Sequence, residues 1–235
     1  MKELENKLKD INGGLVLDIG SGRGEFIHFI TNFGSFEKIT AVDTMEKSGE
    51  LIKKNFPEPD IDFVCANAKD LPFEDETFDT VCISNSLHHL EEMPKILKEM
   101  KRVLKIDGNF IVNEMHCDEQ NEAQMSHVLL HHWFARIDTV FGQKHDPTFS
   151  KQEIRDIIEE LELIEIEIID YHWPACDPKE PEMLKEREKI VDAGLKKLPQ
   201  EENFETLRKE GEEIRSYIQM NGFAPAGSLF VIGRK

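Results

Sequence analysis

The hydrophobic positions in the first half of the chain form short runs, separated by segments in which apolar residues recur at helical spacing. Runs with the length of a strand and little polar alternation occupy residues 15–19, 38–43, 62–66, 78–84 and 109–114. Continuous apolar runs are typical of strands that are covered on both faces. The segments between them, such as 24–33 and 93–105, have the pattern of amphipathic helices. The sequence therefore predicts an α/β fold with a parallel sheet and crossover helices.

The second half contains two further strand patterns of different kinds. Over residues 162–170, isoleucines alternate with glutamates, which predicts a strand with one face in water, close to an edge of the sheet. The last run, residues 228–235, shows no such alternation and predicts a strand with a neighbour on each side. The final strand is therefore expected to insert inside an earlier one.

Two long segments fit neither pattern. Residues 115–149 carry a broad amphipathic repeat, and residues 171–225 carry two more that are separated by Pro199, so both segments predict helices. We expect a single domain over residues 1–235, in which these segments are helical insertions that form a cap over the ligand site. The reason is that both follow strands at the sheet edge where ligands of open α/β sheets bind. A dimer interface is the alternative role for the same helices, so a homodimer is a second expectation.

Composition limits the classes of partner. With 235 residues and 39% hydrophobic content the chain can form one sizeable core. Its formal charge of −18 would repel a polyanionic backbone, so no nucleic-acid partner is expected. No apolar stretch is long enough to span a membrane and the N-terminus lacks a signal-peptide pattern, which predicts a cytoplasmic protein. The cysteines form no CxxC pair, so reduced thiols are expected, with Cys65 and Cys82 in runs that predict buried strands.

The turn after the first predicted strand carries the most informative motif. Gly20, Gly22 and Gly24 connect that strand to a helix, so bare backbone can approach a ligand and the helix end offers N–H groups to negative charge. A nucleotide-like ligand is indicated. The dinucleotide fingerprint requires glycine where this chain has Glu25, and Asp18 just before the turn suits a ligand with a cationic amino group.

The segment D-I-G-S-G-R-G resembles the first motif of class I S-adenosylmethionine-dependent methyltransferases, acidic-x-Gly-x-Gly-x-Gly. Asp43, at the end of the second predicted strand, stands where that family has its ribose-binding acid. Asn67 and Ala68 stand where an Asp-Ala pair flanks the adenine; Asn67 departs from the pattern, although an amide oxygen can also accept a hydrogen bond. The segment FDTVCISNSLHHL is similar to its counterpart in the ubiquinone and menaquinone methyltransferases. The resemblance covers residues 15–114.

The resemblance implies a Rossmann-like, doubly wound and mostly parallel seven-stranded sheet with strand order 3-2-1-4-5-7-6, the last strand antiparallel. It implies S-adenosylmethionine as cofactor, S-adenosylhomocysteine as product, and methyl transfer to a small organic acceptor by direct in-line displacement. The cofactor-binding residues that it implies are Asp18, Gly20, Ser21, Gly22, Gly24, Asp43, Thr44, Asn67, Ala68 and Ser84.

His88 and His89 follow the fourth predicted strand, where the family's transferable methyl group faces the acceptor. They are therefore candidate catalytic residues, either as a base or in orienting the acceptor. Structural capping of the loop is an equally weighted alternative, because a histidine pair is common here in the small-molecule branch whatever the substrate.

The first insertion is rich in histidine. His127, His131 and Asp138 fall on one stripe of a predicted helix, and we expect His127, His131 and Trp133 to line the substrate pocket. Metal binding is an alternative, because other histidines and a cysteine lie nearby in sequence (His116, Cys117, His132, His145). Without an HExxH or paired-cysteine pattern, no metal is expected. Trp173 of the second insertion is a further candidate for the acceptor pocket.

Two functions of other classes remain open at this point. A cofactor-binding protein that acts by interaction, without catalysis, is consistent with Asn67 and with the lack of an identified acceptor group. A nicotinamide-dependent oxidoreductase is disfavoured by Glu25.

Overall fold

The computed structural model describes residues 2–57, 60–174 and 176–235. The chain divides into two compact units. Unit 1 contains residues 1–114, 155–171 and 229–235, and unit 2 contains 115–154 and 172–228. Most of unit 2 thus consists of the segments that the sequence marks as helical insertions.

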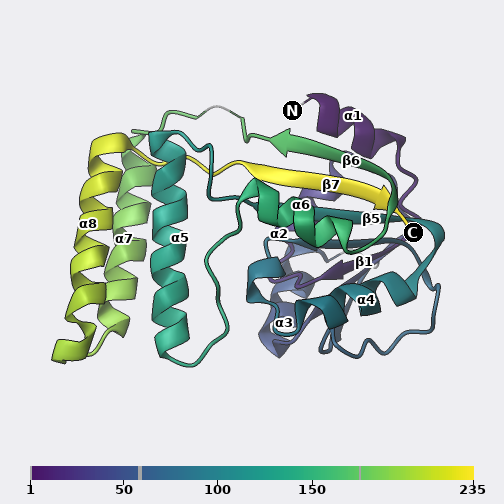
Figure 1. Ribbon diagram of the computed structural model, residues 1–235, viewed down its shortest axis with the longest axis horizontal. Helices are drawn as coiled ribbons and strands as arrows, with labels where there is room; N and C mark the ends of the chain where they lie inside the picture. The colour runs from purple at the N-terminus through teal and green to yellow at the C-terminus, as the bar shows by residue number, and fades with distance from the viewer. Residues whose placement is uncertain (1, 58–59, 175) are drawn as a thin grey trace. The chain divides into compact units, whose positions relative to one another are not determined.

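Unit 1 is built on a seven-stranded sheet with the order β3-β2-β1-β4-β5-β7-β6, as predicted. The strands are β1 (Leu15–Ile19), β2 (Lys38–Asp43), β3 (Ile61–Cys65), β4 (Phe78–Ser84), β5 (Leu104–Met115), β6 (Ile164–Tyr171) and β7 (Ser228–Arg234). Parallel pairing joins β3, β2, β1, β4 and β5, and Leu17 of β1 lies opposite Thr40 of β2 and Val81 of β4. In Figure 1, β7 points in the opposite direction to β6, so the predicted antiparallel strand is confirmed.

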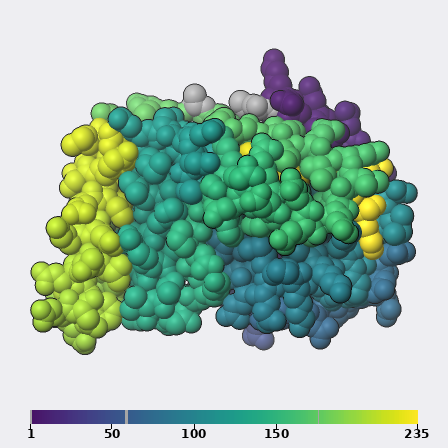
Figure 2. Space-filling model, in the orientation of Figure 1, coloured from purple at the N-terminus to yellow at the C-terminus, as the bar shows by residue number. Residues whose placement is uncertain are grey.

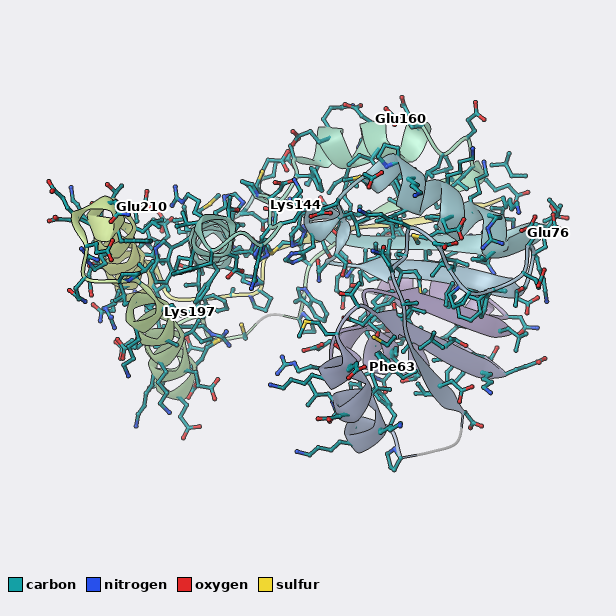
Figure 3. The ribbon with its side chains drawn as sticks, turned by 90° about the horizontal axis from the view of Figure 1, so that it is seen from below. Phe63, Glu76, Lys144, Glu160, Lys197 and Glu210 are labelled. Carbon is teal, nitrogen blue, oxygen red and sulfur yellow. The ribbon has the colours of Figure 1, made fainter. Side chains whose placement is uncertain are left out.

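The helices of unit 1 lie along the sheet. They are α1 (Lys2–Asp10), α2 (Glu25–Thr31), α3 (Glu46–Asn55), the 3-10 helix η1 (Leu87–His89), α4 (Met93–Val103) and α6 (Lys151–Glu159), whose first residues belong to unit 2. Phe63 of β3 lies beside α3, where a side chain at Gly49 would collide with its ring (Figure 3). The Phe29 ring of α2 lies 5.5 Å from the Phe230 ring of β7 between centroids. The contact between Phe29 and Phe230 fixes α2, and with it the helix end that the glycine turn approaches.

The last two strands differ in burial as their patterns predicted, with one exception. All of β7 except Arg234 is buried, and little of this yellow strand is visible in Figure 2. β6 lies at the edge of the sheet, but Ile164 and Ile166 are 54% and 39% exposed. The expected division into an apolar face and a wet face is thus wrong for the first half of β6, because an edge strand lacks a neighbour on one side.

The cysteines are free thiols in the structure. Cys82 is buried in β4, whereas Cys65 is exposed, which corrects the expectation that both lie in buried strands. The physical reason is position, since β3 is the other edge of the sheet and its apolar run is only partly covered. Among the described helices, none has both the length and the apolar character that crossing a bilayer requires.

The described residues of unit 2 form the long helices α5 (Glu122–Val140), α7 (Pro181–Lys197) and α8 (Glu205–Asn221), with a short 3-10 helix, η2 (Glu202–Phe204), before α8 (Figure 1). Trp133 of α5 is completely buried in their core and donates its Nε1–H to the Leu207 carbonyl at 2.7 Å. A Cβ atom at Gly194 or Gly211 would lie 2.5 Å from the Trp133 ring. Glycine at these positions lets α7 and α8 approach α5 closely.

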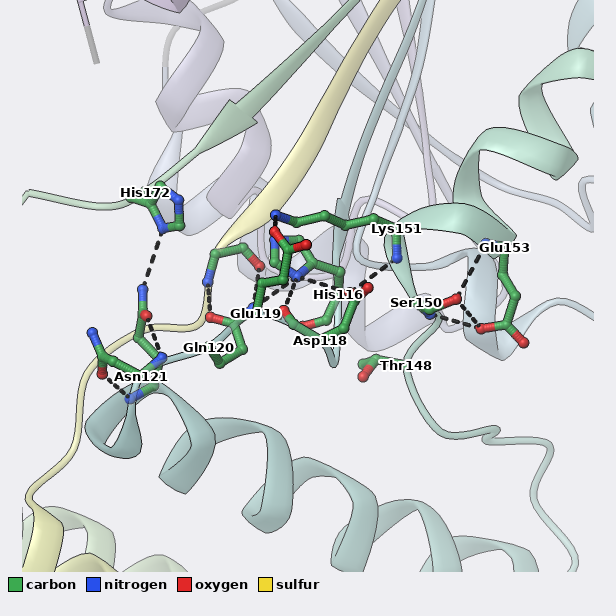
Figure 4. A network of polar contacts seen from close by, with 12 residues as sticks. His116, Asp118, Glu119, Gln120, Asn121, Thr148, Ser150, Lys151, Glu153 and His172 are labelled. Carbon is green, nitrogen blue, oxygen red and sulfur yellow. Dashed lines mark hydrogen bonds and ion pairs between the residues drawn. The ribbon is translucent and has the colours of Figure 1, made fainter.

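A polar network joins the segments that begin and end unit 2 (Figure 4). The Gln120 amide accepts from the Gly227 N–H at 2.9 Å and donates to the His116 carbonyl at 2.8 Å. The Lys151 N–H donates to the Asp118 carboxylate at 3.0 Å. The chain that follows β5 is therefore tied both to the chain that precedes β7 and to the start of α6.

Candidate functional site

The residues that the motifs single out in unit 1 follow the carboxyl ends of β1, β2, β3 and β4. The carboxyl ends of parallel strands lie at one edge of a sheet, and this edge is where open α/β folds bind ligands. The turn between β1 and α2 is held there by backbone bonds. The Gly20 and Ser21 N–H groups both donate to the Val42 carbonyl of β2, at 2.8 and 3.0 Å.

Gly20 could not be replaced by a larger residue without moving its surroundings. Its φ is +68°, and a Cβ atom there would lie 2.6 Å from the Ser86 Oγ. The Ser86 hydroxyl donates to the Gly20 carbonyl at 3.3 Å. Gly22 and Gly24 also have positive φ values, +52° and +87°. The turn is therefore a bare backbone surface that adjoins the chain leaving β4.

Asp43 holds the same turn from the side of β2. Its Oδ2 accepts from the Gly22 N–H at 3.0 Å, and its Oδ1 accepts from the Met45 N–H at 2.9 Å. A carboxylate has about four lone-pair sites, so each oxygen can accept a further hydrogen bond from a ligand hydroxyl. The half-buried position of Asp43 suits that role.

Asp18 is the most perturbed acid of the site. It is 1% exposed, its Oδ1 accepts a hydrogen bond from the Cys82 thiol at 3.5 Å, and its Oδ2 has no hydrogen-bond partner among the described residues. Burial raises the pKa of Asp18 to about 7; the Cys82 contact opposes this shift and the charge of Asp43 adds to it. A buried carboxylate with an unused oxygen is well suited to a ligand ammonium group, which would favour its ionised form.

The remaining predicted cofactor residues lie after β2, β3 and β4. Thr44 is exposed. Ala68 is buried, and the exposed Asn67 accepts from the Lys69 N–H at 3.0 Å through its Oδ1. The Ser84 hydroxyl accepts from the Asn113 side-chain amide at 2.8 Å. The amide oxygen of Asn67 keeps a second lone pair, so the departure from aspartate does not remove the acceptor.

The two candidate catalytic histidines have different environments in the structure. His88 is 1% exposed, and its Nδ1 contacts the carboxylate of Glu114, which is fully buried at the end of β5. The other oxygen of Glu114 accepts from the Leu87 N–H at 3.3 Å. His89 is exposed and lies against His88, with ring centroids 4.3 Å apart. His88 is thus held in one orientation by a buried acid.

Sequence reasoning missed Glu114. It stands at the end of the apolar run 109–114, where a polar residue is easily taken for the end of a strand. The available signal was its position, because Glu114 directly follows three apolar residues and an asparagine in a run that is predicted to be buried. A buried carboxylate rarely occurs without a partner, and the loop after the preceding predicted strand carries histidines.

The candidate pocket residues of unit 2 occupy different environments. His127 is held by the Ala226 N–H, which donates to its Nδ1 at 3.0 Å, and burial together with the Arg187 charge lowers the His127 pKa to about 4. His131 lies beside His145, with 3.3 Å between their Nε2 atoms. Trp133 is part of the helical core and presents no accessible surface. The structure therefore does not bring these three residues together on one open surface.

Trp173 does lie on an open surface of unit 2. A hollow of about 690 Å³ is bordered by this side chain, His172, Gln124 and three prolines, Pro174, Pro178 and Pro225, among others. Trp173 is 38% exposed, and the Gln124 amide contacts the His172 ring at 3.4 Å. This surface combines apolar rings with a few polar groups.

Comparison with known proteins agrees with the motifs. Residues 17–112 match the methyltransferase domain family. The chain is 36% identical over 103 residues to the sterol 4-C-methyltransferase strm-1 of Caenorhabditis elegans, which is 42% of this chain and 30% of that protein. It is 26% identical over 114 residues to the demethylmenaquinone methyltransferase of Thermotoga maritima, 48% of this chain and 49% of that protein. The chain thus matches half or less of the length of these relatives.

The fold has relatives along nearly the whole chain. The crystal structure of a proposed methyltransferase from Bacillus halodurans superposes with a TM-score of 0.64 at 18% identity, covering 99% of this chain and 97% of that one. The family resemblance predicted from the glycine turn and the segments after β2, β3 and β4 is confirmed by the domain match, and the predicted fold class is confirmed by the sheet.

Proposed function

We propose that this chain, whose residues 17–112 match the methyltransferase domain family, is an S-adenosylmethionine-dependent methyltransferase that acts on a small organic acceptor. The observation that carries the proposal is the pair of acids beside the glycine turn. Asp18 offers a buried oxygen to an ammonium group, and Asp43 offers two oxygens to a ribose. A pyrophosphate, which a nicotinamide dinucleotide would place at this turn, would be repelled by the same acids.

The role of the chain is to bind and orient both substrates. When bound, the cofactor would supply a methyl group on a sulfonium sulfur. An acceptor lone pair would bond to the methyl carbon in line as the carbon–sulfur bond breaks, and S-adenosylhomocysteine would be the leaving group. The glycine turn and Asp43 would hold the adenosyl part, Asp18 would hold the amino-acid part, and Ala68 with Asn67 would border the adenine. Proximity and orientation account for much of the acceleration in such reactions.

His88 is the group we assign to proton removal when the acceptor atom carries a proton. An ionised carboxylate can only accept, so Glu114 fixes the His88 proton on Nδ1 and leaves Nε2 as the basic atom. Glu114 is then a positioning residue. His89 is exposed and lies against the His88 ring, and it is the weaker candidate because it is open to solvent.

Unit 2 is proposed to supply the acceptor site. The chain enters unit 2 after β5 and β6 and leaves it before β7, so its connections begin at the strand ends that carry Glu114 and Tyr171. The hollow beside Trp173 suits an apolar ring system. The names of two relatives give a sterol and demethylmenaquinone as the molecules that are methylated. An acceptor of that apolar class is therefore the first to test. Retention of turnover after deletion of residues 183–218 would contradict this proposal.

Isothermal titration calorimetry tests the cofactor assignment. We expect S-adenosylmethionine and S-adenosylhomocysteine to bind with one site per chain, and NAD to give no heat. A radiolabelled methyl group followed across a panel of sterols, quinones and small amines then tests turnover. Binding without transfer to any acceptor would favour the alternative of a cofactor-binding protein that acts by interaction. Absence of heat with both adenosyl ligands, or tight NAD binding, would refute the proposal.

Asp43→Ala should weaken binding of S-adenosylhomocysteine by about 1.5–3 kcal/mol, because it removes charge-assisted acceptors from the ribose and from Gly22. Asp43→Asn keeps one acceptor oxygen and should lose less. Both affinities are measured by calorimetry. Equal affinity of wild type and Asp43→Ala would show that Asp43 only supports the turn.

The cytoplasmic location and the homodimer stay predictions from the sequence, and a small-molecule acceptor remains the proposed partner.

A further inference from the structure

Unit 2 contains a group of polar side chains that the proposed methyl transfer does not use. His131 and Asp138 are both on α5, and His145 lies in the segment after that helix. The Asp138 Oδ2 accepts from His145 Nδ1 at 2.9 Å, and His145 Nε2 lies 3.3 Å from His131 Nε2. The two imidazole rings are nearly perpendicular, at 84°, with centroids 4.8 Å apart.

Local structure brings the three side chains together. Residues seven apart on a helix lie on the same face, which places His131 and Asp138 in line. The chain then turns back at Gly142, whose φ is +82°, and the Thr139 hydroxyl donates to the His145 carbonyl at 3.1 Å. His145 is 9% exposed, so its side chain is held against α5.

The separation of the two Nε2 atoms is the distance that a tetrahedral metal ion requires. Zinc binds histidine nitrogen at about 2.0–2.1 Å, and in a tetrahedron two such ligand atoms lie roughly 3.3–3.4 Å apart. A hydrogen bond to a ring nitrogen is normally shorter, about 2.7–3.2 Å. The observed 3.3 Å therefore fits two ligands of one ion better than it fits a strong hydrogen bond.

Asp138 adds the second element of a metal site. Metal-bound histidines commonly donate their other ring N–H to a carboxylate, which fixes the tautomer and the ring orientation. Asp138 stands in that position toward His145, and its other oxygen lies 4.0 Å from the Lys197 ammonium. The His145 lone pair is thereby placed on Nε2, the atom that faces His131.

We propose that His131 and His145 bind a divalent transition metal of the zinc type through their Nε2 atoms, with Asp138 orienting His145. This site goes beyond the proposed methyl transfer. The ion would join the segment after α5 to the helix itself. Imidazole ligands favour zinc, copper, nickel or cobalt over magnesium or calcium.

The test is titration of the full chain with zinc chloride by calorimetry and with cobalt chloride by visible absorption. The exposed thiols Cys65 and Cys176 are first replaced by serine, so that they do not compete. We expect one equivalent of metal to bind, with the intense visible bands of tetrahedral cobalt. His131→Gln and His145→Gln should each abolish this binding, and Asp138→Asn should weaken it by about 10–100-fold.

His132→Gln is the matched control. His132 is the neighbour of His131, but its Nε2 contacts the Thr148 hydroxyl at 2.8 Å and takes no part in the pair. The His132→Gln variant should bind metal as tightly as the parent protein, in which only Cys65 and Cys176 are replaced. Circular dichroism shows whether each variant is folded. Failure of the parent to bind one equivalent would overturn the proposal, and so would binding that persists in a folded His131→Gln or His145→Gln variant. None of these results depends on cofactor binding or turnover, so they leave the proposed methyltransferase function to its own test.

Discussion

Asp18→Asn should produce a protein that is more stable than the wild type at pH 8 and binds S-adenosylmethionine far more weakly. The folded protein raises the pKa of Asp18 from 3.8 to about 7 through burial. An acid with a raised pKa in the folded state is protonated there at a pH where the unfolded chain has lost the proton. The free energy of unfolding therefore falls as pH rises from about 4 to 7, and the penalty is complete above pH 7.

The size of the stability effect follows from the shift. Each pKa unit corresponds to about 1.36 kcal/mol, so the penalty at pH 8 is at most about 4 kcal/mol. Asparagine has nearly the same shape and carries no charge, so the variant escapes this penalty. Urea denaturation at pH 4.5 and pH 8 should show a gain that is small at the lower pH and several times larger at the higher one.

The binding effect has the opposite sign. The cofactor ammonium loses a buried charged acceptor in Asp18→Asn, and affinity should fall by ~2–4 kcal/mol, roughly 30- to 1,000-fold. In the wild type, affinity should itself drop by about tenfold between pH 8 and pH 6, because most Asp18 carboxyl groups become protonated over that range. The variant should lack this pH dependence.

Asp62→Asn is the control for both measurements. Asp62 is an exposed acid of β3 that pairs with Lys38 at 2.6 Å, and exposed pairs contribute little to stability. It should change neither the free energy of unfolding nor the affinity appreciably. An Asp18→Asn variant that binds the cofactor as tightly as the wild type would remove Asp18 from the site, whatever its stability.

The parts of the fold that were predictable are those set by local pattern. The strands β1, β2 and β4 are covered on both faces, so their apolar runs have the bounds that the structure shows. β5 begins at Leu104, five residues before its apolar run, because Lys105 and Asp107 interrupt the pattern although the backbone already pairs with β4. The start of β5 therefore depends on pairing with the neighbouring strand β4, which the local sequence pattern does not show.

In the candidate site too, the predictable residues are those that a local sequence pattern marks. Asp18 and Asp43 were identifiable because each stands at a fixed place beside a strand end and a glycine turn. Glu114 was not, since it acquires its role from His88, which follows a different strand. His145 was named only as a nearby histidine, because its place beside His131 depends on a reversal of the chain after the helix. Periodicity describes which face a residue occupies, but it does not show which distant side chain meets it there.

Glu114→Gln should reduce turnover without disturbing the fold or the cofactor site. Glutamine keeps an oxygen for the Leu87 N–H, but its amide can donate to His88 Nδ1. The His88 proton would then move to Nε2, and the atom that should accept a proton from the acceptor would carry one instead. Removal of a general base typically costs ~10²–10⁴-fold in rate, so His88→Gln should fall in that range once an acceptor is known.

A double-mutant cycle separates this role from a structural one. If Glu114 acts only through His88, the variant that carries both substitutions should be no slower than His88→Gln alone, because residues that work as a unit are not additive. Affinity for S-adenosylhomocysteine should stay at the wild-type value in all three variants, and His89→Gln, which alters the exposed neighbour, should keep full turnover.

The tautomer itself can be observed without any acceptor. Nitrogen-15 NMR distinguishes a ring protonated at Nδ1 from one protonated at Nε2, and we expect the first in the wild type and the second in Glu114→Gln. The glutamine substitution is chosen because removing one member of a buried ionic pair outright typically costs about 3–5 kcal/mol, so alanine would confuse unfolding with loss of function. An unchanged His88 tautomer in Glu114→Gln, together with unchanged turnover, would show that the buried pair serves packing alone.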